Sequence, residues 1–304
     1  MTRTWLIALL AGAHLAAAHQ ADAQRRDRED RIARIDTTLT LARGGLVELE
    51  GPDGDMIVTG WDRDEVRVRA TNNDGDLRLD ATSSRIQLKS VGMGWSDVRY
   101  EVTVPTGTRL LLNGRSTEIT VRGTRGEVEA HTQNGDIAIE DATSVTVNAL
   151  NGDVELRTMD RVRVNLVAGD VRITGGRGAI EVVTVSGDVE MHGMTSRSVS
   201  AGTSSGEVFY EGAIDPSGRY ELTSHSGNVV VRLPADVSAA VRLQTYSGEI
   251  ESDFPIHLEG GATMGGHPRS FDFRIGNGGA RITMTSFSGA VRLQRAGTSN
   301  RQED

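Results

Sequence analysis

Four short stretches decide the fold: QNGDIAI at residues 133–139, LNGDVEL at 150–156, VAGDVRI at 167–173 and VSGDVEM at 185–191. Each contains a glycine, then an aspartate, then alternating apolar and polar residues. The pattern recurs with small changes along most of the chain, and we call its glycines the marker glycines. They are Gly54, Gly75, Gly135, Gly152, Gly169, Gly187, Gly206, Gly227, Gly248 and Gly289.

The spacing of the marker glycines indicates a stacked repeat. From Gly135 to Gly248 they follow one another at intervals of 17 to 21 residues. Gly94 and Gly114 divide the gap between Gly75 and Gly135 at a similar spacing, and the 41 residues from Gly248 to Gly289 correspond to two turns. Internal repeats of this period are typical of solenoids, so the sequence predicts about a dozen turns in one register.

The residues after each marker glycine predict which side chains face inward. The second residue after the glycine is always apolar, and the third is often charged, as in Glu155, Arg172 and Glu190. Alternation with a period of two is the signature of a strand with one buried face. The predicted inward residues are Met56, Leu77, Ile137, Val154, Val171, Val189, Val208, Val229, Ile250 and Val291.

A second strand is predicted in each turn, as in residues 160–166, so a turn consists of two short strands and two corners. One repeat cannot bury its apolar face alone, whereas repeats stacked at ~4.8 Å form a continuous core. The sequence therefore predicts an all-β, single-domain parallel β-solenoid (β-helix-like) of about a dozen turns of roughly 17–21 residues. Antiparallel meanders or a β-sandwich also use many short strands. The solenoid is favoured because sandwich strands do not keep one offset pattern for ten copies.

The repeats also resemble a known family. The copies LNGDVELRT, VSGDVEMHG and YSGEIESDFP, with the opening LVELEGPDGDMIVTGWDRDEVRVRA and the later VVVRLPADVSAAVRLQTYSGEI, are similar to the putative-adhesin family. These are bacterial β-strand-repeat envelope proteins of the domain-of-unknown-function 4097 type, and the resemblance covers roughly residues 39–293. It implies a surface or periplasmic interaction role and brings no catalytic residues. Gly114, which lacks the Asp-apolar pattern after it, and the glycine-rich segment 259–279 depart from the repeat.

The N-terminal sequence predicts export. Residues 1–23 combine Arg3, an apolar stretch and a small-x-small site at 21–23, which together are typical of a signal peptide. A retained membrane anchor is the alternative, but the apolar stretch is short for the ~20 residues of a spanning helix. We predict a signal peptide at 1–23, a charged linker at 24–36, the repeat domain at 37–295 and a disordered tail at 296–304. The mature protein is expected in the periplasm or on the cell surface, without a transmembrane segment.

Composition narrows the function classes. The chain has no cysteine, which excludes disulfides and cysteine-based metal or nucleophile chemistry. The net charge is −9 without long blocks of one sign, which argues against nucleic acid as a partner. We expect no cofactor.

An acidic column is the clearest candidate site. It comprises Asp55, Asp76, Asp136, Asp153, Asp170, Asp188, Glu207 and Glu249, each next to a marker glycine. The four residues Asp136, Asp153, Asp170 and Asp188 are weak candidates for cation binding. Calcium takes 6–8 oxygen ligands, whereas one acid per turn supplies few, so the column is better explained by turn formation.

Other chemistry-bearing residues do not form a motif. The histidines of the mature chain stand at different offsets from the marker glycines, and a zinc site needs three or four converging ligands. They are His131, His192, His225, His257 and His267. Serines precede several marker glycines, as at Ser186 and Ser205, and are interpreted as turn formers. The stretch 260–268 lacks the lysine of a phosphate loop.

Two function classes fit these observations. The first is a non-catalytic, adhesin-like or scaffold module that presents the faces of a rod to an envelope protein or glycan. The second is a β-helix enzyme acting on polysaccharide, which would use clustered carboxylates. Only Trp61 with the acids at 62–65, and the region around Trp95, approach such a cluster, and the first is better explained as a polar hairpin. The non-catalytic module is favoured.

Overall fold

The computed structural model describes residues 32–91, 97–255 and 269–297. The predicted signal peptide, most of the predicted linker and tail, Gly94, Trp95, His257, His267 and much of the glycine-rich segment lie outside the described residues. Strand β1 begins at Ala33, so residues 33–36, predicted as linker, are part of a strand.

Every element of secondary structure in these three ranges is a β-strand, which confirms the all-β prediction. The N-terminal strands are β1 (Ala33–Thr40), β2 (Leu46–Trp61), β3 (Glu65–Asn72), β4 (Asp76–Ala81), β5 (Arg85–Val91) and β6 (Asp97–Pro105). The middle strands are β7 (Arg109–Arg122), β8 (Glu127–Asn134), β9 (Ile137–Asn151), β10 (Val154–Ala168), β11 (Val171–Thr174), β12 (Ala179–Ser186), β13 (Val189–Met194), β14 (Ser198–Ser205), β15 (Val208–Gly212), β16 (Arg219–Ser226) and β17 (Val229–Leu233). The C-terminal strands are β18 (Ala239–Thr245), β19 (Ile250–Ser252), β20 (Arg269–Ile275), β21 (Ala280–Ser288) and β22 (Val291–Arg295).

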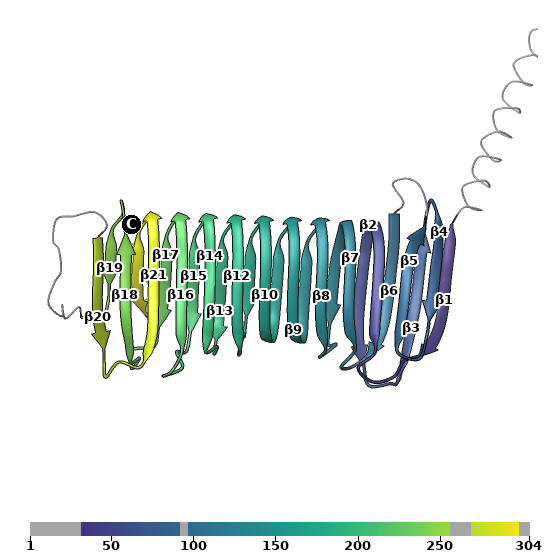
Figure 1. The fold of residues 1–304 in the computed structure, drawn as a ribbon, viewed down its shortest axis with the longest axis horizontal. Helices are drawn as coiled ribbons and strands as arrows, with labels where there is room; N and C mark the ends of the chain where they lie inside the picture. Colours follow the sequence, from purple (N-terminus) through teal and green to yellow (C-terminus); the bar gives the residue numbers. More distant parts are fainter. Residues whose placement is uncertain (1–31, 92–96, 256–268, 298–304) are drawn as a thin grey trace, which may run out of the picture.

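The strands lie side by side along the long axis of the molecule and form two faces (Figure 1). We call the face whose strands run into the marker glycines the upstream face, and the face whose strands leave them the downstream face. Through the middle, β8, β9, β10, β12, β14 and β16 follow one another in parallel on the upstream face. On the downstream face β9, β10, β11, β13, β15 and β17 do the same.

The predicted register is observed in this middle part. Val154 pairs with Val171 and Val171 with Val189, while the charged Glu155 pairs with Arg172 and Arg172 with Glu190. Side chains at the predicted inward position are buried at Met56, Ile137, Val154, Val171, Val189, Val208, Val229 and Val291. Leu77 and Ile250, which lie near the two ends, are only partly buried. The inward side chains of both faces join in one core cluster.

The marker glycines are required by close stacking of the corner. Gly187 has a φ of +140°, and a Cβ there would lie 1.9 Å from the carbonyl oxygen of Gly169 in the preceding turn. Neither the backbone angle nor the space admits another residue. Buried hydroxyls support some of these corners: Thr203 and Ser224 donate to the carbonyl oxygens of Gly187 and Gly206 at 3.0 and 2.9 Å.

The N-terminal end departs from the predicted repeat. β2 pairs in parallel with β7, so Gly54 lies opposite Thr117, and the turn of Gly135 stacks next on Thr117. The segment between β2 and β7 does not continue the stack in sequence order. It adds β5 and β6 to the outer side of β2, and beyond them β4 pairs antiparallel with β5, and β3 with both β6 and β1. This segment forms a cap, so Gly75, which lies between β3 and β4, does not mark a turn of the solenoid. Gly114 does not mark one either, because it pairs with Gly51 within the β2–β7 ladder.

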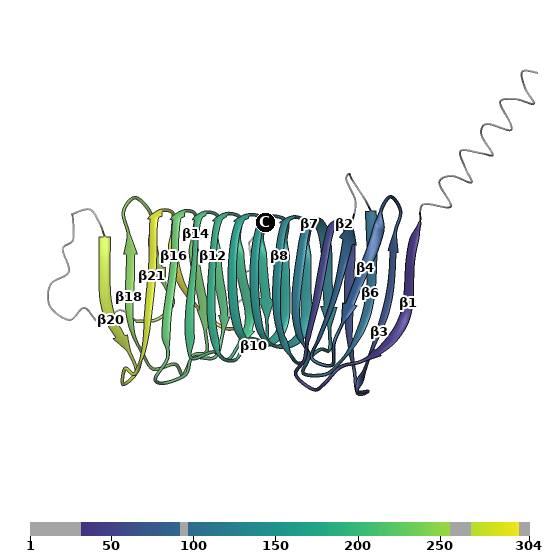
Figure 2. The same ribbon diagram turned by 45° about the vertical axis from the view of Figure 1, so that its right-hand side comes forward.

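The C-terminal end corrects a second prediction. The interval from Gly248 to Gly289 is not two further turns, because β21 inserts between β16 and β18, and β22 inserts between β17 and β19. Gly289 thus stacks on Gly227, and Gly248 stacks on Gly289. Residues 269–275 of the predicted glycine-rich segment form β20, which pairs antiparallel with β18. β1 and β20 lie at opposite ends of the molecule (Figure 2). The sheet is mixed, and only its interior has the predicted parallel order.

Candidate functional site

The four candidate aspartates lie in one row at the marker corner and are linked by hydrogen bonds. The backbone N–H of Asp153 donates to Oδ1 of Asp136 at 2.9 Å, and the N–H of Asp170 donates to Oδ1 of Asp153 at 2.9 Å. The N–H groups of Asp188 and Glu207 continue the ladder, donating to Oδ1 of Asp170 and of Asp188 at 2.8 and 2.7 Å. One oxygen of each aspartate therefore satisfies a backbone donor of the next turn.

Glu207 joins this row as predicted, whereas Asp55, Asp76 and Glu249 do not join its hydrogen-bond ladder. Asp76 begins β4 in the N-terminal cap, Glu118 lies opposite Asp55, and Ala290 precedes Glu249 in the stack. Within the described ranges, no three His, Asp or Glu side chains are arranged to hold a metal ion. The row acts as a structural ladder, and cation binding by its outer oxygens stays an untested prediction.

The other sequence candidates lie apart from one another. His131 contacts Glu129 at 2.8 Å on β8, whereas His192 lies on β13 of the other face, 3.5 Å from Glu190. The stretch after Trp61 connects β2 to β3, which do not pair with each other, so the predicted polar hairpin is wrong as a pairing. Nε1 of Trp61 donates to the carbonyl oxygen of Glu65 at 2.6 Å, which closes this connection.

Buried ionisable groups are held by structural contacts. Glu48 is 6 % exposed and accepts hydrogen bonds from Arg85 in the N-terminal cap. Burial raises the pKa of Tyr210, whose hydroxyl donates to the carbonyl oxygen of Ala213 at 3.0 Å. Burial also raises the pKa of Tyr220, which donates to the carbonyl oxygen of Ser196 at 2.6 Å.

A surface feature of a different kind lies on the upstream face, two residues before the marker glycines. We call it the outer apolar column. Its members are Leu150, Val167, Val185, Ser204, His225, Phe287 and Tyr246, in spatial order along the rod. The five apolar and aromatic members other than His225 have exposed fractions between 45 and 50 %. Contiguous exposed apolar side chains are typical of an interaction surface.

The aromatic part of the column is stacked along the rod. The rings of His225 and Phe287 have centroids 4.8 Å apart at 13°, and those of Phe287 and Tyr246 are 4.8 Å apart at 5°. The spacing equals the separation of neighbouring strands, so the backbone register imposes the stack. The faces of Phe287 are covered by its two neighbours, and its edge is directed outward.

Sequence reasoning missed this column, although a signal was present. The residue two places before each marker glycine lies on the outward side of its strand by simple alternation. Leu, Val, Phe or Tyr is unexpected at an outward position on a solvent-exposed strand face. Phe287 and Tyr246 become neighbours only because β21 inserts beside β18, which the spacing of the glycines could not indicate.

The fold and surface define a class: an all-β repeat protein of solenoid-like form, with a continuous core and an exposed apolar column. The chain belongs to the Toastrack DUF4097 family, whose model matches residues 53–294. This confirms the family resemblance seen in the repeats.

Comparison with characterised proteins adds little beyond the family. No curated protein matches the chain. Among solved structures, a "putative cell adhesion protein" from Clostridium sporogenes matches with 9 % identity over 86 % of this chain and 99 % of that one, with a TM-score of 0.19. No helix in the described ranges is long and apolar enough to cross a membrane.

Proposed function

We propose that this chain is a non-catalytic, adhesin-like interaction module of the cell envelope, and that it binds a protein partner along the outer apolar column. The signal-peptide-like sequence at residues 1–23 supports export to the periplasm or cell surface. Membership of a family of unknown function is compatible with this role and does not identify the partner.

The observation that carries the proposal is the outer apolar column itself. Leu150, Val167 and Val185 project from three successive strands, and the ring stack of His225, Phe287 and Tyr246 continues the same line beyond Ser204. Burying such side chains contributes roughly 25 cal/mol per Å² of apolar surface. Because parallel strands hold them in register, little side-chain ordering is needed on binding.

A protein partner fits this surface better than a sugar. Aliphatic branches at Val167 and Val185 offer no hydrogen bonds to hydroxyl groups, and the stacked ring of Phe287 presents its edge outward. Aromatic and branched apolar side chains in a line are typical of the core of a protein interface.

The absence of catalysis is part of the proposal. A polysaccharide lyase or hydrolase needs an acid and a base that converge on one bond. Within the described ranges the aspartate row is engaged in backbone hydrogen bonds, and the buried Glu48 is paired with Arg85. These contacts favour a structural role for the acids.

Binding of the labelled mature chain to envelope fragments tests the proposal. We expect saturable binding that is lost when the fragments are treated with protease. The variant Phe287→Ser with Tyr246→Ser should weaken binding, because it removes the stacked rings without touching the core. Thr285→Ser with Gln244→Ser, one outward position earlier on β21 and β18, is the matched control and should bind normally.

Two results would contradict the proposal. Binding that survives both protease treatment and loss of the rings would exclude a protein partner at this column. Release of new reducing ends or unsaturated sugars from a panel of polysaccharides would show catalysis instead.

A further inference from the structure

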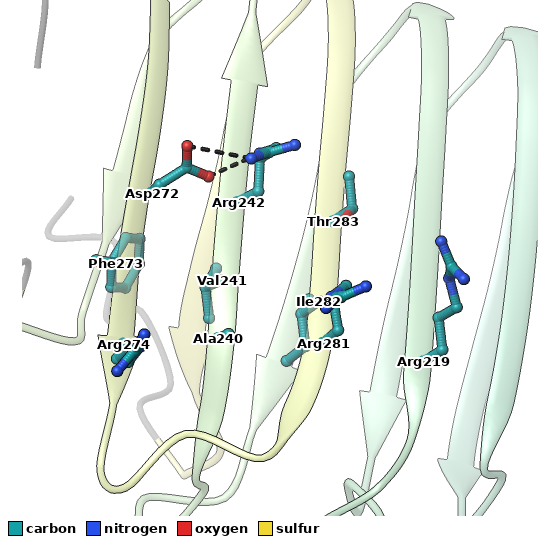
Figure 3. A pocket seen from close by; sticks show the side chains of 10 residues that line it. All are labelled: Arg219, Ala240, Val241, Arg242, Asp272, Phe273, Arg274, Arg281, Ile282 and Thr283. Carbon is teal, nitrogen blue, oxygen red and sulfur yellow. Dashed lines mark hydrogen bonds and ion pairs between the residues drawn. The ribbon is translucent and has the colours of Figure 1, made fainter. Parts of the chain in front are cut away.

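A second row of side chains on the upstream face carries positive charge without acids. We call it the basic row. It runs across eight neighbouring strands along one edge of the upstream face, and the outer apolar column runs along the other edge of the same face. Its members are Ser144, Arg161, Ala179, Ser198, Arg219, Arg281, Ala240 and Arg274, in spatial order. Figure 3 shows the last four of these on adjacent strands. The four arginines are exposed, in a chain whose net charge is −9.

The neighbouring row, two residues further along each strand, contains acids, and both of its arginines are paired. There Arg163 pairs with Glu181 at 3.0 Å, and Nε of Arg242 contacts Asp272 at 2.7 Å. Among the described residues, by contrast, Arg161, Arg219 and Arg281 make no ion pair. Arg219 and Arg281 lie directly opposite each other in the register, an arrangement of like charges that disfavours the sheet unless an anion is present.

Two grooves lie along the basic row. One, of about 570 Å³, is lined by Arg219, Arg281, Ala240 and Arg274 together with the Arg242–Asp272 pair (Figure 3). The other, of about 310 Å³, includes Arg161, Ala179 and Ser198. In both, small side chains at Ala240, Ala179 and Ser198 stand between arginines. The basic row therefore follows two separate grooves that are lined by arginines. Across its eight strands the row is about 34 Å long at the ~4.8 Å spacing of strands.

We propose that the basic row binds a linear carboxylated polysaccharide, such as a polyuronate, laid along the rod axis across the strands. Guanidinium groups match carboxylates in bidentate geometry. A chain with one carboxylate per sugar repeats its charge at intervals similar to the strand spacing, so it meets Arg219 and Arg281 in succession. The length of the row suits a polymer better than a single anion.

Nucleic acid is a poorer fit to the same charges. Proteins that bind single strands stack bases on aromatic side chains along a basic groove, and the basic row contains no aromatic residue.

This site is independent of the protein-binding surface proposed above. On β21 Arg281 and Phe287 are six residues apart, at opposite edges of the face. A variant of one row is therefore expected to leave binding at the other unchanged, and failure of either proposal can be recognised separately.

The test is fluorescence anisotropy of a labelled oligogalacturonate titrated with the mature chain at low salt. The variant Arg219→Gln with Arg281→Gln should bind roughly tenfold more weakly. The matched control, Arg172→Gln with Arg292→Gln, removes the same charge from paired arginines on the downstream face and should bind like the wild type. Glu221→Gln, which removes an acid next to Arg219 on β16, should tighten binding. Melting temperatures verify that every variant is folded.

Several results would overturn the proposal. They are no binding of oligogalacturonate at low salt, equal loss in the two double variants, and equal binding of a neutral oligosaccharide of the same length. Binding of oligothymidylate that is tighter than that of oligogalacturonate, and is lost in the Arg219/Arg281 variant, would assign the row to nucleic acid instead.

Discussion

The middle of the rod and its two ends are built on different rules. Between β7 and β17 each turn stacks on the turn before it, and chain order equals spatial order on both faces. At the N-terminal end antiparallel strands lie outside β2, although they follow β2 in sequence. At the C-terminal end the last strands, β21 and β22, lie inside β18 and β19.

The difference teaches how a repeat is terminated. A stack of identical turns would leave open strand edges at both ends, and open edges pair with other chains. Among the described strands, the antiparallel β1 and β4 are outermost at the N-terminal end. At the C-terminal end the antiparallel β20 is outermost on the upstream face and the parallel β19 is outermost on the downstream face. The ends are also where the inward positions, Leu77 and Ile250, are less well buried. We therefore expect mutations of equal kind to have larger effects in the middle than at the ends.

The largest effect is expected for Val171→Asp in the middle of the core. Val171 is 0 % exposed, so an unpaired carboxylate there should lower the free energy of unfolding by about 4 kcal/mol or more. Ile250→Asp, at a partly buried position of the terminal turn, should have roughly half that effect. Urea denaturation measures both. Arg172→Ala is the control and should change stability by under ~1 kcal/mol; equal effects of V171D and R172A would refute the register.

A marker glycine is the next most sensitive position. In Gly187→Ala the new Cβ would lie 1.9 Å from the carbonyl oxygen of Gly169 at a φ of +140°, so we expect a loss of about 3 kcal/mol. Gly107, between β6 and β7, also has a positive φ, but a Cβ there meets no atom within 4 Å. Gly107→Ala should cost about 1 kcal/mol from backbone strain alone. Similar melting temperatures for the two variants would show that close stacking does not restrict the corner.

A stabilising change is expected at the second corner of the middle turns. Thr158 has a φ of +60°, where the following turns have Gly175 at +76° and Gly193 at +61°. A β-branched residue is strained in this region, so Thr158→Gly should raise stability by about 0.5–1 kcal/mol. Thermal unfolding measures the shift. The reverse change, Gly193→Thr, is expected to lower the melting temperature by a similar amount, and the opposite sign for either variant would contradict this explanation.

Charge reversal on the outward side of the middle should have a smaller effect. Arg172 lies 2.9 Å from Glu190 and lowers the pKa of that carboxyl through its hydrogen bond. Because the pKa of Glu190 is lowered in the folded state, the ion pair stabilises the fold at pH values above the usual pKa range of a carboxyl group. This stabilisation is lost as the pH falls through the lowered pKa. Arg172→Glu should destabilise by a few tenths of a kcal/mol at neutral pH and low salt. The penalty should shrink as salt is added, and one that is independent of salt would exclude pairing as the cause.

The smallest effect is expected from removal of divalent cations. Repulsion between exposed carboxylates at strand spacing is about 0.9 kcal/mol in water, and salt reduces it further. The ladder from Asp136 to Glu207 provides hydrogen bonds of ~1 kcal/mol each that offset this repulsion. A chelator should therefore leave the circular dichroism and melting temperature of the mature protein unchanged. Loss of structure that millimolar calcium restores would make the aspartate row a metal site.

Sequence alone predicted the middle of the molecule and little of its surface function. The inward position of Val171 and the outward position of Arg172 follow from alternation about a glycine, because a strand with one buried face leaves no other choice. The same reasoning placed Asp153 beside Asp170. It did not predict that each carboxylate accepts a hydrogen bond from the next turn, since that depends on the exact offset between turns.

The order of strands at the ends was decided only by tertiary structure. The local pattern specifies which face of a strand is buried. It does not specify whether a later strand adds to the end of the stack or inserts between two earlier strands, because that choice depends on how the open strand edges are covered. That choice brings Phe287 between His225 and Tyr246, and Arg281 between Arg219 and Ala240. Residues separated by 41 or 62 positions in the sequence thus become neighbours in both candidate binding surfaces. The repeat could be predicted from the sequence because each turn has the same local pattern of a glycine followed by alternating inward and outward residues. The surfaces could not, because they depend on pairing between strands that are distant in the sequence.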